Sequence, residues 1–121
     1  MENKVQRGRR GEDAALEWLE AQGMWLRERN WRWEHREIDL IMESPQWLHI
    51  VEVKLLRMPS AIEPWEQVGA QKQRNLAIAA DHYVRMNRIE KEVHFDIVSI
   101  GEEAGGAMRI EYIPEAFIPM G

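Results

Sequence analysis

The stretch HREIDLIMESPQWLHIVEVKL, residues 35–55, predicts the centre of the fold, because it holds two apolar runs separated by a turn. The runs 37–42 and 48–55 are rich in aliphatic and β-branched residues, and the Ser and Pro between them favour a turn. A turn at residues 43–46 makes the runs an antiparallel pair with Asp39 opposite Ile50. Because side chains alternate along a strand, one face of this hairpin carries Glu37, Asp39, Glu52 and Lys54. The other face carries Ile38, Leu40, Val51 and Val53.

The charged face of the hairpin has two explanations. One face of an antiparallel pair is often solvated, and Glu52 with Lys54 then forms a surface ion pair that contributes under ~1 kcal/mol. Alternatively, the carboxylates lie close together. Crowded like charges raise one another's pKa and oppose folding unless a cation lies among them. The second explanation predicts a partner for Asp39 and Glu52.

Composition limits the class of protein. A chain of 121 residues with 45% hydrophobic content fits one domain, 1–121. It has no cysteine, which excludes disulfides and thiolate metal sites and favours a cytoplasmic location. The start MENKVQRGRR does not resemble a signal peptide, and no apolar run approaches the ~20 residues of a membrane span. The net charge of −5 resides in residues 90–121, so charge alone does not support a nucleic-acid partner.

The rest of the chain predicts an α/β fold of order αβββαββ, a mixed five-stranded sheet flanked by helices. Apolar spacing predicts helices over 11–22 and 64–87, the first ended by Gly23 and the second begun by Pro64. Alternating patterns predict the remaining strands at 24–33, 94–100 and 108–113.

Two charged residues interrupt the apolar stripes of these helices. Glu12 precedes Ala15 and Leu16 by three and four positions, so it extends the stripe of the first helix toward the sheet. A carboxylate in a first helical turn also suits the helix dipole. Lys72 lies between Val68 and Leu76, and its stem can cover apolar surface while its ammonium group stays in water.

A hard divalent cation, Mg²⁺ or Mn²⁺, would use these carboxylates, with Asp39 and Glu52 as its ligands. Such an ion polarises a phosphoryl oxygen and lowers the pKa of bound water, and a lysine beside it offsets developing charge. These parts fit phosphodiester hydrolysis. The four histidines have no metal-ligand spacing, and we interpret them as structural or surface residues.

REIDLIM, followed by the thirteen-residue step from Asp39 to Glu52 in VEVK, resembles the PD-(D/E)xK nuclease superfamily. More closely, the chain resembles the YraN-like family of small bacterial proteins. The shared features span residues 8–117 and occur in order: GRRGEDAALEWLEAQG, RNWR, EIDLI, VEVK, Lys72, FDIV and EAF. E-x-K alone is a weak signal, but the ordered set is specific.

The resemblance implies a restriction-endonuclease-like core in which Asp39 and Glu52 bind metal, Lys54 is the catalytic lysine and Glu12 is a helix carboxylate of the site. Residues expected to contact nucleic acid are Arg32, Arg36, Arg57 and Lys72. The chain departs from the family pattern in two places: Arg36 replaces a glycine, and Leu56 replaces an arginine, with Arg57 one residue later.

Two hypotheses for function follow. The first is a Mg²⁺-dependent endonuclease acting on DNA, including branched or otherwise structured DNA. The second is a non-catalytic module that keeps the nuclease fold and binds nucleic acid or protein. Resolvases of the superfamily are dimers, so a homodimer is one possible state, and the sequence leaves the oligomeric state open.

Overall fold

The computed structural model describes residues 1–119, apart from the side chains of Pro64 and Trp65. Its elements follow the chain as α1 (Lys4–Ala21), β1 (Trp25–Trp33), β2 (Arg36–Glu43), β3 (Trp47–Arg57), the 3-10 turn η1 (Pro64–Gln67), α2 (Ala70–Asn87), β4 (Glu92–Glu102) and β5 (Met108–Phe117). The predicted order αβββαββ and the mixed five-stranded sheet are confirmed.

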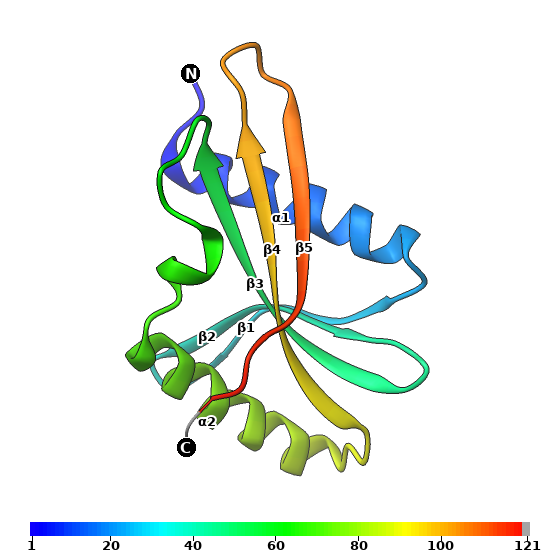
Figure 1. Ribbon diagram of the computed structural model, residues 1–121. Coiled ribbons are helices and arrows are strands. Elements are labelled where there is room, and N and C mark those ends of the chain that lie inside the picture. Colours follow the sequence, from blue (N-terminus) through cyan, green and yellow to red (C-terminus); the bar gives the residue numbers. More distant parts are fainter. Residues whose placement is uncertain (120–121) are drawn as a thin grey trace.

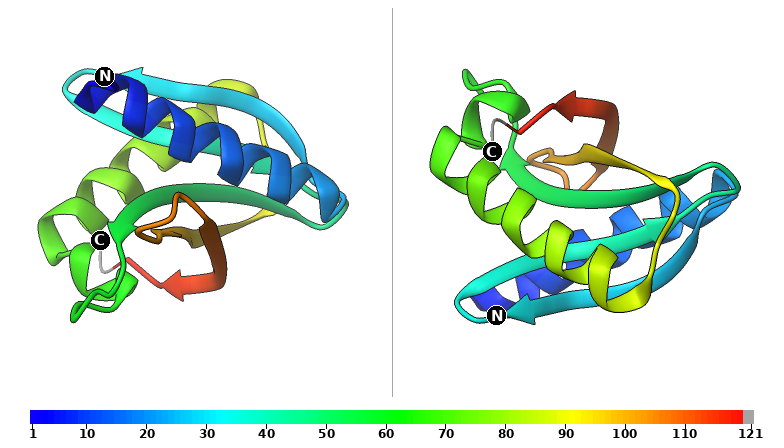
Figure 2. Two further views of the ribbon diagram at one scale, coloured as in Figure 1. Left: turned by 90° about the horizontal axis from the view of Figure 1, so that it is seen from above. Right: turned by 90° about the horizontal axis from the view of Figure 1, so that it is seen from below.

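The sheet has the strand order β1-β2-β3-β4-β5. Neighbouring strands are antiparallel except β3 and β4, which run parallel because α2 connects them as a crossover. The β1–β2 hairpin turns away from the long strands β3, β4 and β5 (Figure 1). Helix α1 packs on one face of this twisted sheet and α2 on the other (Figures 1 and 2).

Helix α1 begins seven residues before the predicted start at residue 11. The reason is a capping box, in which Asn3 Oδ1 accepts the backbone N–H of Gln6 and the Gln6 side chain accepts the N–H of Asn3. The first turns, KVQRGRR, are too polar to carry an apolar stripe. Apolar spacing therefore could not locate the helix start.

The predicted long helix from residue 64 is instead two elements. Residues Pro64–Gln67 form a 3-10 turn, and α2 begins at Ala70 with Gly69 as its extended N-cap. The predicted end at residue 87 is confirmed, because Arg88 adopts the left-handed conformation that terminates the helix. Neither helix within residues 1–119 is long and apolar enough to cross a membrane.

The register of the central hairpin differs from the prediction. Glu43 pairs with Leu48 and Leu40 with Val51, so the turn lies one residue later than expected and Asp39 is not opposite Ile50. The backbone N–H of Ser44 bonds the carbonyl of Trp47 and fixes this turn. A shift of two in register keeps each residue on its face, so the predicted facing of Asp39 and Glu52 does not depend on the error.

Among the described residues, the core consists of two clusters, one under each helix. Ile41, Ile50 and Ile97 pack beneath α2, whereas Leu40, Val51 and Val98 pack beneath α1. Ile38 was expected to share a face with Leu40, but it belongs to the α2 cluster. The alternation breaks at Asp39, where the facing residue of β1, Asn30, has a positive φ of 51° and leaves the regular ladder. The sheet bends at this point.

Candidate metal-binding and catalytic site

Asp39 lies where β2 and β3 separate. The regular pairing of the two strands ends at Leu40 and Val51. Beyond it, Asp39 Oδ2 accepts the backbone N–H of Val53 at 2.9 Å, in place of a carbonyl from β2. The carboxylate of Asp39 is thus held in the gap between β2 and β3, next to the β3 residues Glu52 and Val53.

Glu52 is an acidic side chain in the interior, with 2% of its surface exposed. Its Oε2 lies 3.3 Å from Lys54 Nζ and 3.2 Å from Lys72 Nζ, so β3 and α2 each supply one ammonium group. Its Oε1 is buried and has no hydrogen-bond partner among the described residues. A buried carboxylate oxygen without a donor is costly, which indicates a site shaped for another ligand.

Asp39 and Glu52 act on each other electrostatically. Burial of the carboxyl group raises the pKa of Asp39 to about 8 from its ordinary 3.8, and the negative charge of Glu52 adds to the rise. The N–H of Val53 opposes this effect, and a hydrogen bond with Glu52 and the charge of Glu12 reinforce it. In the metal-free protein Asp39 therefore keeps its proton at neutral pH.

Glu12 reaches the edge of this cluster from α1. Its Oε2 accepts from Asn30 Nδ2 at 3.0 Å, and its Oε1 lies 3.5 Å from the guanidinium of Arg29. Because α1 begins at Lys4, Glu12 lies two turns into the helix, and no acidic residue occupies the first turn. The helix-dipole explanation of Glu12 is therefore wrong.

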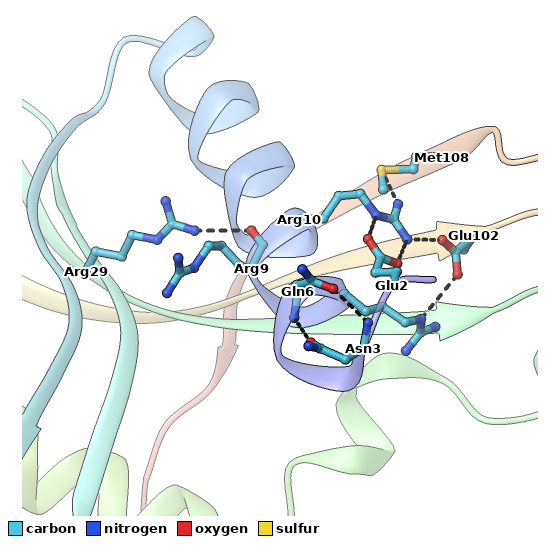
Figure 3. A network of polar contacts seen from close by, with 9 residues as sticks. Glu2, Asn3, Gln6, Arg9, Arg10, Arg29, Glu102 and Met108 are labelled. Carbon is cyan, nitrogen blue, oxygen red and sulfur yellow. Dashed lines mark hydrogen bonds and ion pairs between the residues drawn. The ribbon is translucent and has the colours of Figure 1, made fainter.

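The position of α1 is fixed by polar contacts near its N-terminus (Figure 3). Arg10 bridges Glu2 and Glu102, which ties the helix to the end of β4. Arg29 of β1 donates to the carbonyl of Arg9 at 3.2 Å (Figure 3). These contacts hold the turn that carries Glu12 beside the β1–β2 hairpin. Arg29 and Asn30 were not predicted as site residues. In the sequence they are marked only by their place in the RNWR motif.

The other expected residues lie in different places. Lys72, in the first turn of α2, joins the cluster through Glu52. Glu37 does not, because it pairs with Arg32 at 2.7 Å on the surface. Arg36 bonds Glu34 near the β1–β2 turn, and Arg57 is exposed at the far end of β3. Of the four residues expected to contact nucleic acid, Lys72 alone contacts the acidic pair.

The donor set fits a hard divalent cation. Within residues 1–119, no group of three or more His, Cys, Asp or Glu side chains could hold a metal ion. Asp39 and Glu52 instead offer carboxylate oxygens from two strands, and Mg²⁺ commonly uses one or two carboxylates and fills its other positions with water and substrate phosphate. The partnerless Oε1 of Glu52 and the raised pKa of Asp39 are both features that a cation would relieve.

Comparison with known proteins identifies the family. The model of the uncharacterised protein family UPF0102 matches residues 11–100. A UPF0102 protein of Bacteroides fragilis is 41% identical over 112 residues, covering 93% of this chain and 92% of the relative. UPF0102 proteins of Porphyromonas gingivalis and Rhodococcus opacus are 39% and 36% identical and cover 92% and 97% of this chain, and 83% and 100% of their own lengths. The expected YraN-like relationship is confirmed, and the chain belongs to the uncharacterised protein family UPF0102.

Proposed function

We propose that this protein is a Mg²⁺- or Mn²⁺-dependent nuclease that hydrolyses phosphodiester bonds in DNA. The observation that carries the proposal is the buried Glu52 carboxylate, whose Oε1 has no partner among the described residues while Asp39 and Lys54 lie beside it. A surface ion pair does not explain this arrangement, because 2% exposure removes Glu52 from water.

Each residue has a task in this proposal. Asp39 and Glu52 would hold the ion, and Asp39 gives up its proton as the ion binds. When bound, the ion supplies a polarised phosphoryl oxygen and a bound water of lowered pKa. Lys54, whose side chain is 22% exposed, is positioned to donate to a phosphate oxygen that gains charge in the transition state. Glu12 is held by Arg29 and Asn30 at the edge of the site, where it would orient water bound near the ion.

Lys72 supports a polyanionic substrate. Its side chain is 42% exposed, and among the described residues its ammonium group pairs with a single oxygen of Glu52, so it remains available to a phosphate on the solvent side. The rest of the surface gives weaker support, since the net charge is −5. One chain offers little basic surface, so we propose that a homodimer binds structured DNA with two such surfaces.

A cleavage assay tests the proposal. Labelled duplex, single-stranded, flapped and four-way-junction DNA are incubated with purified protein and Mg²⁺ or Mn²⁺. We expect cleavage of at least one substrate, abolished by EDTA. Glu52→Gln and Lys54→Ala should each lower the rate at least ~100-fold, because each removes a group that contacts ion or phosphate.

Matched controls separate the site from general effects of charge. Glu37→Gln changes a carboxylate on the same hairpin that pairs with Arg32 at the surface, and Lys91→Ala removes a lysine that pairs with Glu43. Both should retain wild-type cleavage. Inactive wild-type protein that still binds one of these DNAs would support the second hypothesis, a nucleic-acid-binding module without catalysis.

A further inference from the structure

A second polar cluster lies on the face of the sheet that α1 covers. Ser44 Oγ lies 2.8 Å from His49 Nε2, and His49 Nδ1 lies 2.7 Å from Asp96 Oδ2. His49 and Asp96 are buried, with 3% and 0% of their surfaces exposed, whereas Ser44 is half-buried in the turn between β2 and β3. The three side chains follow one another in the order hydroxyl, imidazole, carboxylate. Since His49 is three positions from Glu52 on β3, the two point to opposite faces of the sheet.

The hydrogen bonds of Asp96 determine which imidazole nitrogen carries the proton. Tyr112 Oη donates to Asp96 Oδ2 at 2.6 Å, and the backbone N–H of Glu115 donates to Oδ1 at 2.9 Å. Burial and the bond to Asp96 raise the pKa of Tyr112, so the phenol keeps its proton. Because a carboxylate can only accept, the contact with Asp96 places a proton on His49 Nδ1, and Nε2 is the nitrogen that can accept from Ser44.

The turn holds Ser44 in this orientation. Its backbone N–H donates to the Trp47 carbonyl at 2.9 Å, and its own carbonyl accepts from Lys91 Nζ at 2.9 Å. The hydroxyl is thus carried by a backbone fixed on both sides. A nucleophile needs this restraint, because its oxygen must stay within hydrogen-bond distance of its base.

A cavity of about 260 Å³ opens beside Ser44 and His49. Its walls are mostly apolar and aromatic, and include Met24, Pro45, Trp47, Tyr112 and Pro114. Gln22 also lines it, and a glutamine side chain has an N–H group that can donate to a carbonyl oxygen. A space of this size and character suits a small uncharged ester.

We propose that Ser44, His49 and Asp96 form a second, metal-independent site that hydrolyses small carboxylic esters. Ser44 Oγ bonds the carbonyl carbon while His49 Nε2 takes the hydroxyl proton. The bond from carbon to the alkoxy oxygen breaks, and the departing alcohol receives that proton. Water then attacks the acyl-serine, gives a proton to Nε2, and releases the acid as Ser44 Oγ recovers the proton. Asp96 orients the ring and stabilises its charged form.

A purely structural network would show the same contacts but no reactivity at Ser44. Wild-type protein in EDTA is therefore treated with diisopropyl fluorophosphate, which replaces its fluoride with a serine oxygen. We expect one adduct per chain, on the peptide that contains Ser44. Hydrolysis of p-nitrophenyl acetate should fall at least ~100-fold in Ser44→Ala, which keeps the buried His49–Asp96 pair.

Two comparisons complete the test. Ser60→Ala, which changes a serine of the exposed loop before α2, should keep both labelling and hydrolysis. His49→Gln should lose both, and circular dichroism reports whether it is folded. Folded wild-type protein without an adduct on Ser44, or equal hydrolysis by wild type and Ser44→Ala, would overturn the proposal.

Discussion

Replacing Asp39 with Asn should stabilise the metal-free protein at alkaline pH, although it changes a residue of the proposed active site. The amide is nearly isosteric with the carboxyl group. Its oxygen can still accept the N–H of Val53, and its NH₂ group adds a donor to the neighbourhood of Glu52. The substitution removes the charge that burial and Glu52 disfavour.

The sign and size of the effect follow from the raised pKa of Asp39. The folded pKa of about 8 lies above the ordinary 3.8, so the stabilisation from keeping the proton is present below pH 3.8 and is lost as pH rises toward 8. One pKa unit corresponds to about 1.4 kcal/mol, which sets an upper limit near 6 kcal/mol. Two lysines next to Glu52 and partial contact with solvent reduce it, so we expect ~1–3 kcal/mol.

Urea unfolding at pH 5, 7 and 9 in EDTA measures this effect. The unfolding free energy of wild type should fall by ~1–3 kcal/mol across this range relative to Asp39→Asn, which is a midpoint difference of about 1 M urea. Asp81→Asn, which changes an exposed carboxylate of α2, is the control and should follow wild type. Equal pH dependence of wild type and Asp39→Asn would refute the reasoning.

Three further predictions concern the surroundings of the site and the core. Lys72→Ala should lower the free energy of unfolding by less than ~1 kcal/mol, because this side chain is 42% exposed. The same variant should bind DNA more weakly in fluorescence anisotropy at low salt, and unchanged affinity would exclude a phosphate contact. Glu12→Gln removes a charge that raises the pKa of Asp39, so the lowest pH at which Mn²⁺ binds should decrease in titrations. The same lowest pH in wild type and variant would show that Glu12 is not part of the site. Leu19→Ala, at a fully buried position of α1, should cost ~2–5 kcal/mol in thermal or urea unfolding, and a loss below 1 kcal/mol would contradict its place in the core.

The sequence predicted the order of elements and the shared face of Glu52 and Lys54, because both depend on residue periodicity. It did not predict the break in alternation at Asp39, which puts Ile38 and Leu40 into different clusters. It did not predict the start of α1, which depends on one reciprocal cap between Asn3 and Gln6. The predicted register of the hairpin was also wrong. It depends on the hydrogen bond from the Ser44 N–H to the Trp47 carbonyl, which the alternation of apolar and polar residues does not determine.

Polar contacts between residues far apart in the chain also could not be predicted from the sequence. Lys72 was noticed as an interruption of an apolar stripe, but its contact with Glu52 needs the crossover that brings α2 to β3. His49 was interpreted as structural or surface, and the structure places it in a buried network with Asp96, 47 positions away. The available signal was a polar residue inside each of two apolar strands, LHIVEV and FDIVSI. Such residues are hydrogen-bonded when buried, but the sequence does not say to what.

Calorimetric titration of the purified protein with Mn²⁺ tests the central claim most directly, because it asks whether Asp39 and Glu52 share one divalent cation. We expect one ion per chain at pH 7.5, with a heat that varies with the ionisation enthalpy of the buffer because Asp39 loses its proton on binding. Glu52→Gln should bind at least ~10-fold more weakly, whereas the surface variant Glu37→Gln should match wild type. Absence of binding at millimolar Mn²⁺, or equal binding by wild type and Glu52→Gln, would contradict the account.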